Sequence, residues 1–194
     1  RFRDRWFAPD ARGALVLLAL WPWALLFPAA EPFGLGQVFE RLEVALADLL
    51  AGTPFLDWLP VREAQLLPLS PVAELLCVAL GLLVPCLLAY SMVRHLGRRV
   101  VLVLSIALVG VAATALSAAL SYGPANAWAW LGMPVRVGIW VGLVLAALLV
   151  ALPPRASAVL LLVVLTLQLG LLNDAPTSAY FAQTLLTWEQ GRFI

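Results

Sequence analysis

The sequence has 194 residues, of which 63% are hydrophobic and only 12% are charged, and its formal net charge is +1. Soluble domains are about 45–50% apolar and 25% charged, so this composition excludes a water-soluble fold and predicts one membrane domain. The small net charge argues against nucleic acid as a partner. All twelve basic residues are arginine, which suggests, with so much alanine and leucine, a GC-rich bacterial genome.

The first apolar run covers residues 13–30 and follows several arginines. A basic stretch before an apolar one also resembles a signal peptide, but Pro28 and Pro32 interrupt the small residues that a cleavage site needs. We therefore expect a retained first span, kinked near Pro22 because proline removes a helix hydrogen bond.

Residues 31–70 form the longest stretch without an apolar run, and this stretch is acidic. Within it, the apolar residues of 35–51 fall on one helical face and the charged residues fall opposite. This pattern predicts an amphipathic helix lying along the outer membrane surface. Packing of the same face on the ends of neighbouring spans is the alternative, and the sequence leaves both open.

Two longer apolar runs, 72–93 and 100–121, are joined by the basic hinge Arg94-His95-Leu96-Gly97-Arg98-Arg99. About 20 helical residues cross a bilayer core, and a segment in hydrocarbon satisfies its backbone hydrogen bonds as a helix. Arginine-rich short loops stay on the cytoplasmic side of a membrane. The hinge therefore predicts a cytoplasmic turn between the second and third spans.

The last two apolar runs, 135–152 and 156–173, are separated only by Pro153-Pro154-Arg155. So short a connection predicts an adjacent antiparallel pair, and residues 174–194 read as a second outer-surface segment. The expected fold is an all-α integral membrane protein with five transmembrane helices and outer-surface amphipathic helices. A sixth span beyond Ile194 stays open.

The arginines also predict the orientation. With the amino terminus inside, the twelve arginines divide into eight on the cytoplasmic side and four on the outer side. That excess predicts a multi-pass protein of the bacterial inner membrane with its amino terminus in the cytoplasm. We expect membrane lipids as its partners, and other membrane-protein subunits as further candidates.

One charged pair is a candidate site. Glu74 lies one turn into the second span, and Arg136 opens the fourth span on the same outer side. A carboxylate near a helix amino terminus is also favoured by the helix dipole alone. If the two helices are neighbours, Glu74 and Arg136 are expected to pair directly or through one water.

Small and polar residues within the spans predict helix packing. Gly138 and Gly142 form a GxxxG pattern in the fourth span, and such patterns allow helices to approach closely. The third span offers a face of small residues that includes Gly110, Thr114 and Ser117. Gln168 in the fifth span is expected to hydrogen-bond a neighbouring helix rather than a substrate.

No catalytic, cofactor-binding or metal site is expected. Cys77 and Cys86 are nine residues apart, which places them on opposite faces of one helix, and His95 is the single histidine. Neither a metal-ligand spacing nor a nucleophile motif occurs in the sequence.

The stretch Leu69-Ser70-Pro71-Val72-Ala73-Glu74-Leu75-Leu76-Cys77-Val78-Ala79-Leu80-Gly81-Leu82-Leu83-Val84-Pro85 resembles a helix of VanZ-like bacterial membrane proteins. The layout over residues 60–152 is similar as well, with a basic hinge, a third span, an outer loop and a glycine-marked fourth span. The polar residues typical of that family late in the third span and at the start of the fourth are replaced, here by Thr114 and Arg136 among others.

The resemblance implies an inner-membrane protein of the cell envelope, linked in some relatives to glycopeptide resistance, with no established reaction. We therefore expect a non-enzymatic envelope protein that is VanZ-like in layout. An accessory or scaffolding subunit of a larger membrane complex is one alternative. An enzyme or permease that handles a lipid-linked envelope substrate is the other, and it depends on Glu74, Arg136 and the outer amphipathic helices.

Overall fold

The computed structural model describes residues 11–26, 33, 46, 49–51, 53 and 70–173. These residues form five α-helices and one short 3-10 helix, with no strand among them: α2 (Arg12–Leu26), α4 (Pro71–Met92), α5 (Leu96–Tyr122), η2 (Pro124–Asn126), α6 (Met133–Leu149) and α7 (Pro154–Asn173). The expected all-helical class is confirmed for the described part of the chain.

Local sequence explains where α4 begins and ends. The Ser70 hydroxyl accepts a hydrogen bond from the Ala73 amide at 3.2 Å, and Pro71 occupies the first helical position. Both residues stabilise a helix start. The serine oxygen accepts a hydrogen bond from a first-turn amide that has no partner within the helix, and proline has no amide hydrogen that would need one. The helix ends at Met92, since Val93 turns to an extended backbone conformation.

Three helices, α4, α5 and α7, are long and apolar enough to cross a membrane. The other two are shorter apolar helices, with 15 residues in α2 and 17 in α6. The predicted run 13–30 is therefore helical only to Leu26 within the described residues. The largest shift in a boundary is at α5, which begins at Leu96 instead of residue 100, so that Arg98 and Arg99 lie inside the helix.

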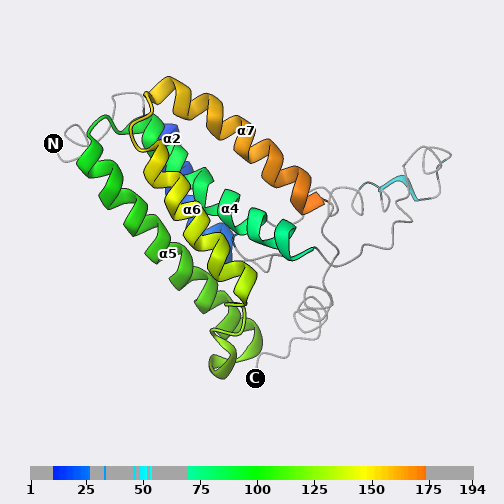
Figure 1. The fold of residues 1–194 in the computed structure, drawn as a ribbon. Helices are drawn as coiled ribbons and strands as arrows, with labels where there is room; N and C mark the ends of the chain where they lie inside the picture. Colours follow the sequence, from blue (N-terminus) through cyan, green and yellow to red (C-terminus); the bar gives the residue numbers. More distant parts are fainter. Residues whose placement is uncertain are drawn as a thin grey trace.

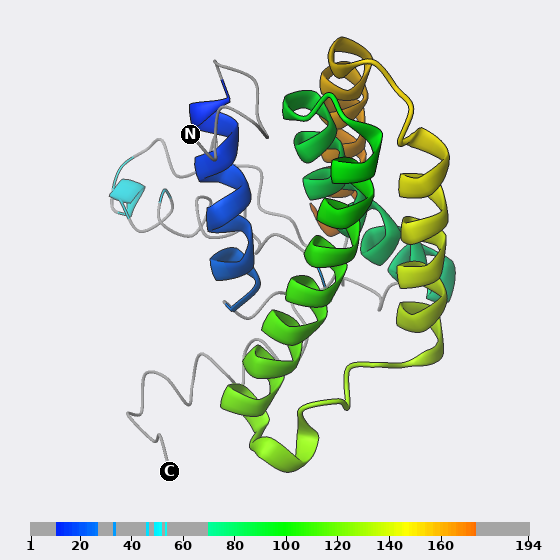
Figure 2. The ribbon, with the colours of Figure 1, turned by 90° about the vertical axis from the view of Figure 1, so that its left-hand side faces the viewer.

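Helix α4 is the centre of the bundle. It packs most extensively against α6 and α7, and it also contacts α5 and α2. Figure 1 shows α5 and α7 on opposite sides of α4, and Figure 2 shows α2 and α6 on opposite sides of α5. Helices α6 and α7 run antiparallel as expected, but the prediction that they are an adjacent pair is wrong, because α7 packs against α4 instead.

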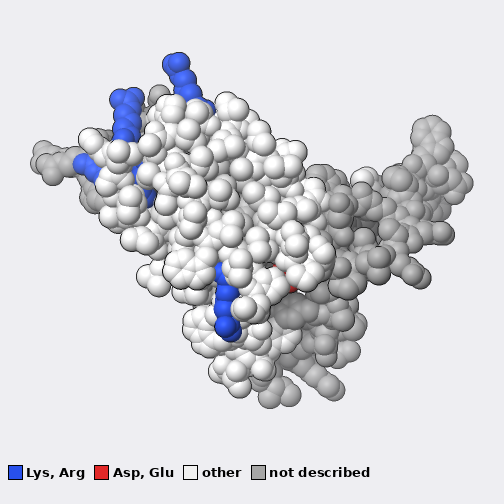
Figure 3. All heavy atoms as spheres, in the orientation of Figure 1, with Lys and Arg blue, Asp and Glu red and all other residues white. Residues whose placement is uncertain are grey.

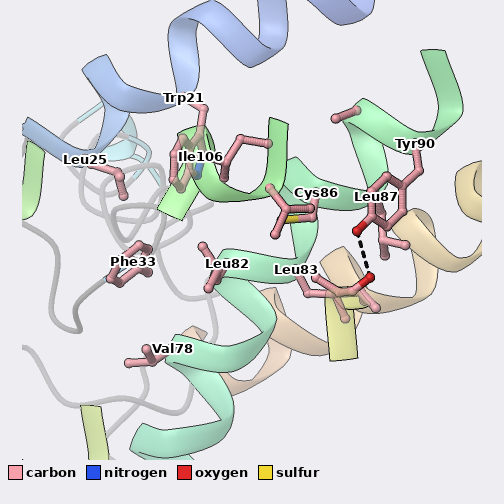
Figure 4. Close-up of a cluster of buried hydrophobic side chains, with 14 of the residues drawn as sticks. Trp21, Leu25, Phe33, Val78, Leu82, Leu83, Cys86, Leu87, Tyr90 and Ile106 are labelled. Carbon is pink, nitrogen blue, oxygen red and sulfur yellow. Dashed lines mark hydrogen bonds between the residues drawn. The ribbon is translucent and has the colours of Figure 1, made fainter. Parts of the chain in front are cut away.

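Helix α4 supplies more of the core than any other described element, including Leu82, Cys86 and Tyr90, all fully buried. Figure 4 shows these residues between α2, α5 and α6, with the Tyr90 hydroxyl directed at a neighbouring carbonyl. That hydroxyl donates a hydrogen bond of 2.7 Å to the Ala146 carbonyl of α6. A buried polar group thereby gains a partner and ties α4 to α6.

Two predicted surface segments fall largely outside this description. The amphipathic helix predicted over 35–51 is described only at Leu46 and at residues 49–51, where Leu46 and Leu49 are exposed. The predicted outer tail, 174–194, lies wholly outside the described residues.

Candidate functional site

The described charges divide between the two ends of the bundle. Glu74 is the only described acid, and it lies with Arg136 where α4 and α6 begin. We call this the opposite end, because most of the described arginines lie at the other end of the bundle. The end where α2, α5 and α7 begin carries the remaining described arginines, and we call it the arginine end: Arg12, Arg94, Arg98, Arg99 and Arg155. Figure 3 shows basic side chains gathered at one end of the molecule, with one more toward the other end.

Arg99 is the central residue of the arginine end. The residue is 2% exposed, and its guanidinium donates four hydrogen bonds to backbone carbonyls. Two of these bonds reach the end of α4, at the Tyr90 carbonyl (2.8 Å) and the Val93 carbonyl (2.6 Å). The other two reach the turn after α6, at Val150 (2.7 Å) and Leu152 (2.6 Å). One side chain therefore joins the α4–α5 hinge to the α6–α7 turn.

The chemistry of this junction explains why the buried arginine is stable although no described acid lies beside it. The last carbonyls of a helix have no partner within the helix and carry the negative end of its dipole. A guanidinium offers five donors in a planar fork, so it satisfies several such carbonyls at once. Its carbon also lies 5.2 Å from the centre of the Tyr90 ring, within the range of a cation–π contact.

Sequence reasoning missed this junction, because it placed Arg99 with Arg94 and Arg98 in a solvated hinge. In the structure the non-helical hinge is only residues 93–95, and Arg99 points back into the bundle. One signal was available in the sequence. No glycine or polar capping residue directly follows Met92, so the terminal carbonyls of α4 required a donor from elsewhere.

A second buried polar contact lies between α4 and α7. Gln168 is 1% exposed, and its Nε2 donates to the Phe33 carbonyl at 3.1 Å, while its Oε1 is buried and has no hydrogen-bond partner among the described residues. Gln168 therefore makes a buried hydrogen bond, but not the predicted one to a neighbouring helix, because its acceptor belongs to the chain between α2 and α4. The absence of a side chain at Gly81 leaves room for this contact, because a Cβ there would lie 2.5 Å from the Phe33 carbonyl oxygen.

Phe33 fills the middle of the helix bundle, and sequence reasoning did not identify it. Its side chain is 2% exposed and lies against the rings of Trp21 and Trp130, at centroid distances of 6.3 and 6.2 Å. A Cβ at Gly110 would come within 2.6 Å of the Phe33 ring. Phe33 also has a φ of 61°, in the left-handed region that non-glycine residues seldom adopt. Close packing holds it in that conformation.

The glycines and small residues named from the sequence lie at helix contacts. Gly138 and Gly142 face α4, where a Cβ would lie 2.7 Å from the Leu75 carbonyl oxygen and 3.0 Å from that of Ala79, respectively. On α5, the Ser117 hydroxyl donates to the Leu26 carbonyl at the end of α2, at 3.1 Å.

Thr114 of α5 contributes a second orphan polar atom. Its hydroxyl oxygen is buried and makes no hydrogen bond to any described residue. Thr114 and Gln168 thus each carry a buried polar atom whose hydrogen-bonding capacity is not satisfied by the described residues. Neither atom belongs to a cluster of reactive groups in the described residues.

Glu74 and Arg136 do not form the predicted pair by direct contact. Helices α4 and α6 are neighbours as the prediction required, but Arg136 directs its Nε to the Leu131 carbonyl at 2.9 Å. No ion pair joins the two side chains in this described part of the chain. Glu74 lies in the first turn of α4, where the helix dipole favours a carboxylate.

The described residues hold no obvious reactive centre. Cys77 and Cys86 are buried and not joined by a disulfide. Between residues 70 and 173 and in the shorter described segments, no three His, Cys, Asp or Glu side chains lie together as metal ligands. The arrangement can hold helices together and present positive charge at one end. No family model, curated protein or solved structure matches the chain.

Proposed function

We propose that this chain is a multi-pass protein of the bacterial inner membrane, with its arginine end in the cytoplasm. The observation that carries the proposal is the segregation of charge: five of the six described arginines lie at one end of a bundle in which three helices are long and apolar enough to span. Arginines accumulate on the cytoplasmic side of membrane proteins. In this proposal α2 and α6 also cross, which gives five spans and a cytoplasmic amino terminus.

We further propose a non-enzymatic role in the cell envelope, with a VanZ-like layout. The order of the described elements from residue 70 to residue 149 supports it: a helix, a short basic hinge, a second helix, a loop with aromatic residues, and a glycine-marked helix. The enzyme or permease alternative depended on a Glu74–Arg136 site, and the two side chains make no direct contact. It therefore has less support than the envelope role.

Cysteine labelling in intact cells tests the membrane orientation. Gly97→Cys places a thiol at the arginine end, where a Cβ meets nothing within 4 Å, and Ala125→Cys places one on the exposed loop at the other end. The parent protein is the matched control, because its own Cys77 and Cys86 are buried. A membrane-impermeant maleimide is expected to label Ala125→Cys in intact cells and Gly97→Cys only after lysis. Labelling of both variants in intact cells contradicts the proposal.

A specific observation favours an accessory subunit as the second candidate. Trp140 lies near the middle of α6 and is 69% exposed, beside the exposed Val137 and Val144. Tryptophan is enriched at membrane interfaces, so an outward tryptophan at mid-helix suits a contact with another protein helix. Purification in a mild detergent, followed by native mass spectrometry, is expected to show a stoichiometric partner that is lost with Trp140→Leu. A bare monomer contradicts this candidate.

A further inference from the structure

The two turns at the arginine end are held as one surface. Arg99 bonds to Val93 in the α4–α5 hinge and to Leu152 in the α6–α7 turn. The beginning of α2 joins them, because Ala11 packs with Met92 and Val93 in a small apolar cluster. Three segments that are far apart in the sequence thus meet at one end of the bundle.

Three arginines project from this surface: Arg12 on α2, Arg94 in the hinge and Arg155 on α7. Each is exposed, and none of their side chains makes a hydrogen bond or ion pair with the described residues. The only described acid, Glu74, lies at the opposite end of the bundle. No described residue therefore occupies the donors of these three guanidinium groups, which suits them to bind an external anion.

The helix dipoles reinforce this positive charge. Helices α2, α5 and α7 begin at the arginine end, and a helix amino terminus carries a partial positive charge. Helices α4 and α6 end there, which by itself would offset that charge. Their terminal carbonyls at Tyr90, Val93 and Val150, however, accept hydrogen bonds from Arg99. Counted over the described residues, the surplus at this end is consequently positive.

We propose that the arginine end binds the phosphate groups of anionic phospholipids through Arg12, Arg94 and Arg155. The proposal rests on the membrane location proposed above, because the ends of spanning helices lie at the level of the lipid headgroups. Guanidinium groups bind phosphate through paired hydrogen bonds, and basic residues close to the membrane are attracted to anionic lipid. Phosphatidylglycerol is the lipid of this class that we choose as the probe.

Native mass spectrometry of the full chain tests this binding. The purified protein is titrated in detergent with phosphatidylglycerol and, separately, with phosphatidylcholine, and the bound lipids are counted. We expect the parent protein to prefer phosphatidylglycerol. Each of Arg12→Gln, Arg94→Gln and Arg155→Gln is expected to lower that affinity about fivefold, and the triple variant is expected to abolish the preference. These exposed side chains make no described contact, so the variants are expected to fold as the parent does.

Arg136→Gln is the matched control, because it removes an exposed arginine from the opposite end, and it is expected to leave the preference unchanged. Equal binding of both lipids by the parent overturns the proposal. So does a preference that survives in the triple variant or that disappears equally with Arg136→Gln. Competition by millimolar inorganic phosphate that removes the bound lipid would identify a site for free phosphate instead. The cysteine labelling above reports orientation without reference to lipid, so the two proposals fail separately.

Discussion

Arg99 and Arg136 occupy equivalent positions in the chain but opposite environments in the fold. Each is the fourth residue of its helix, α5 or α6, and in each helix the residue before the first turn makes no capping bond through its side chain. Arg99 is nonetheless 2% exposed with four carbonyl acceptors, whereas Arg136 is exposed with one.

The direction of the neighbouring helices explains this difference. At the arginine end, α4 and α6 finish, and finishing helices offer carbonyls that an arginine can satisfy. At the opposite end α4, the main packing partner of α6, begins, and a beginning helix offers amide donors, which an arginine cannot use. An arginine in the first turn of a helix can therefore be buried when the neighbouring helices run antiparallel to that helix. Their carboxyl ends then lie beside the arginine and supply its acceptors.

The largest expected effect follows from removing the two arginines separately. Arg99→Met leaves four carbonyls without their donor, and hydrogen bonds to a charged group contribute about 1.5–3 kcal/mol each. We expect the free energy of unfolding to fall by about 3 kcal/mol or more, and by less than about 1 kcal/mol for Arg136→Met. Unfolding in mixed detergent micelles, followed by tryptophan fluorescence, measures both.

Arg99→Lys separates the geometry of this junction from its charge. A lysine ammonium keeps the charge but is a compact group with three donors, and it cannot reproduce the fork that spans two turns. We expect an intermediate loss of stability. Equal losses for Arg99→Met and Arg136→Met would show that burial of Arg99 does not matter.

The next effect tests whether close packing of α4 and α6 stabilises the opposite end, where no buried arginine of the described residues joins the helices. Gly138→Ala brings a Cβ to 2.7 Å from the Leu75 carbonyl oxygen, so α4 and α6 must move apart. Overpacking of this kind lowers the free energy of unfolding by about 1–3 kcal/mol. Gly170→Ala is the control on α7, because a Cβ there meets nothing within 4 Å. A Gly138→Ala variant as stable as Gly170→Ala would refute close contact between the two helices.

A smaller effect tests the second tie between α4 and α6 near the arginine end. Tyr90→Phe removes the hydroxyl that donates to Ala146 and keeps the ring that Arg99 lies over. We expect a loss of about 1 kcal/mol in the free energy of unfolding, the net value of one buried hydrogen bond. A loss as large as that of Arg99→Met would indicate that the hydroxyl also organises the arginine.

The apolar runs predicted the helices well, because long hydrophobic stretches leave few alternatives to helix. The apolar run 72–93 lies within one residue of α4 at each end, since the helix covers Pro71–Met92. The burial of Arg99 was not predictable in the same way, because it depends on where α6 ends, 51 residues further along the chain. Phe33 escaped notice because its place is created by glycines on two other helices, and no local pattern records that contact.

The smallest expected effect concerns the charges at the opposite end. Arg136 already donates to the Leu131 carbonyl and is exposed, so its attraction to Glu74 acts through a solvated medium. Exposed ion pairs contribute about 0.2–1 kcal/mol even in direct contact, and groups without contact contribute additively within about 0.5 kcal/mol. In a double-mutant cycle of Glu74→Gln and Arg136→Gln, we therefore expect unfolding free energies that add. A coupling above about 1 kcal/mol would show that the two side chains pair through water. The opposite end would then hold a charged site after all. Arg99 and Arg136 would differ in the group that each one binds, backbone carbonyls for Arg99 and a carboxylate for Arg136, and not only in burial.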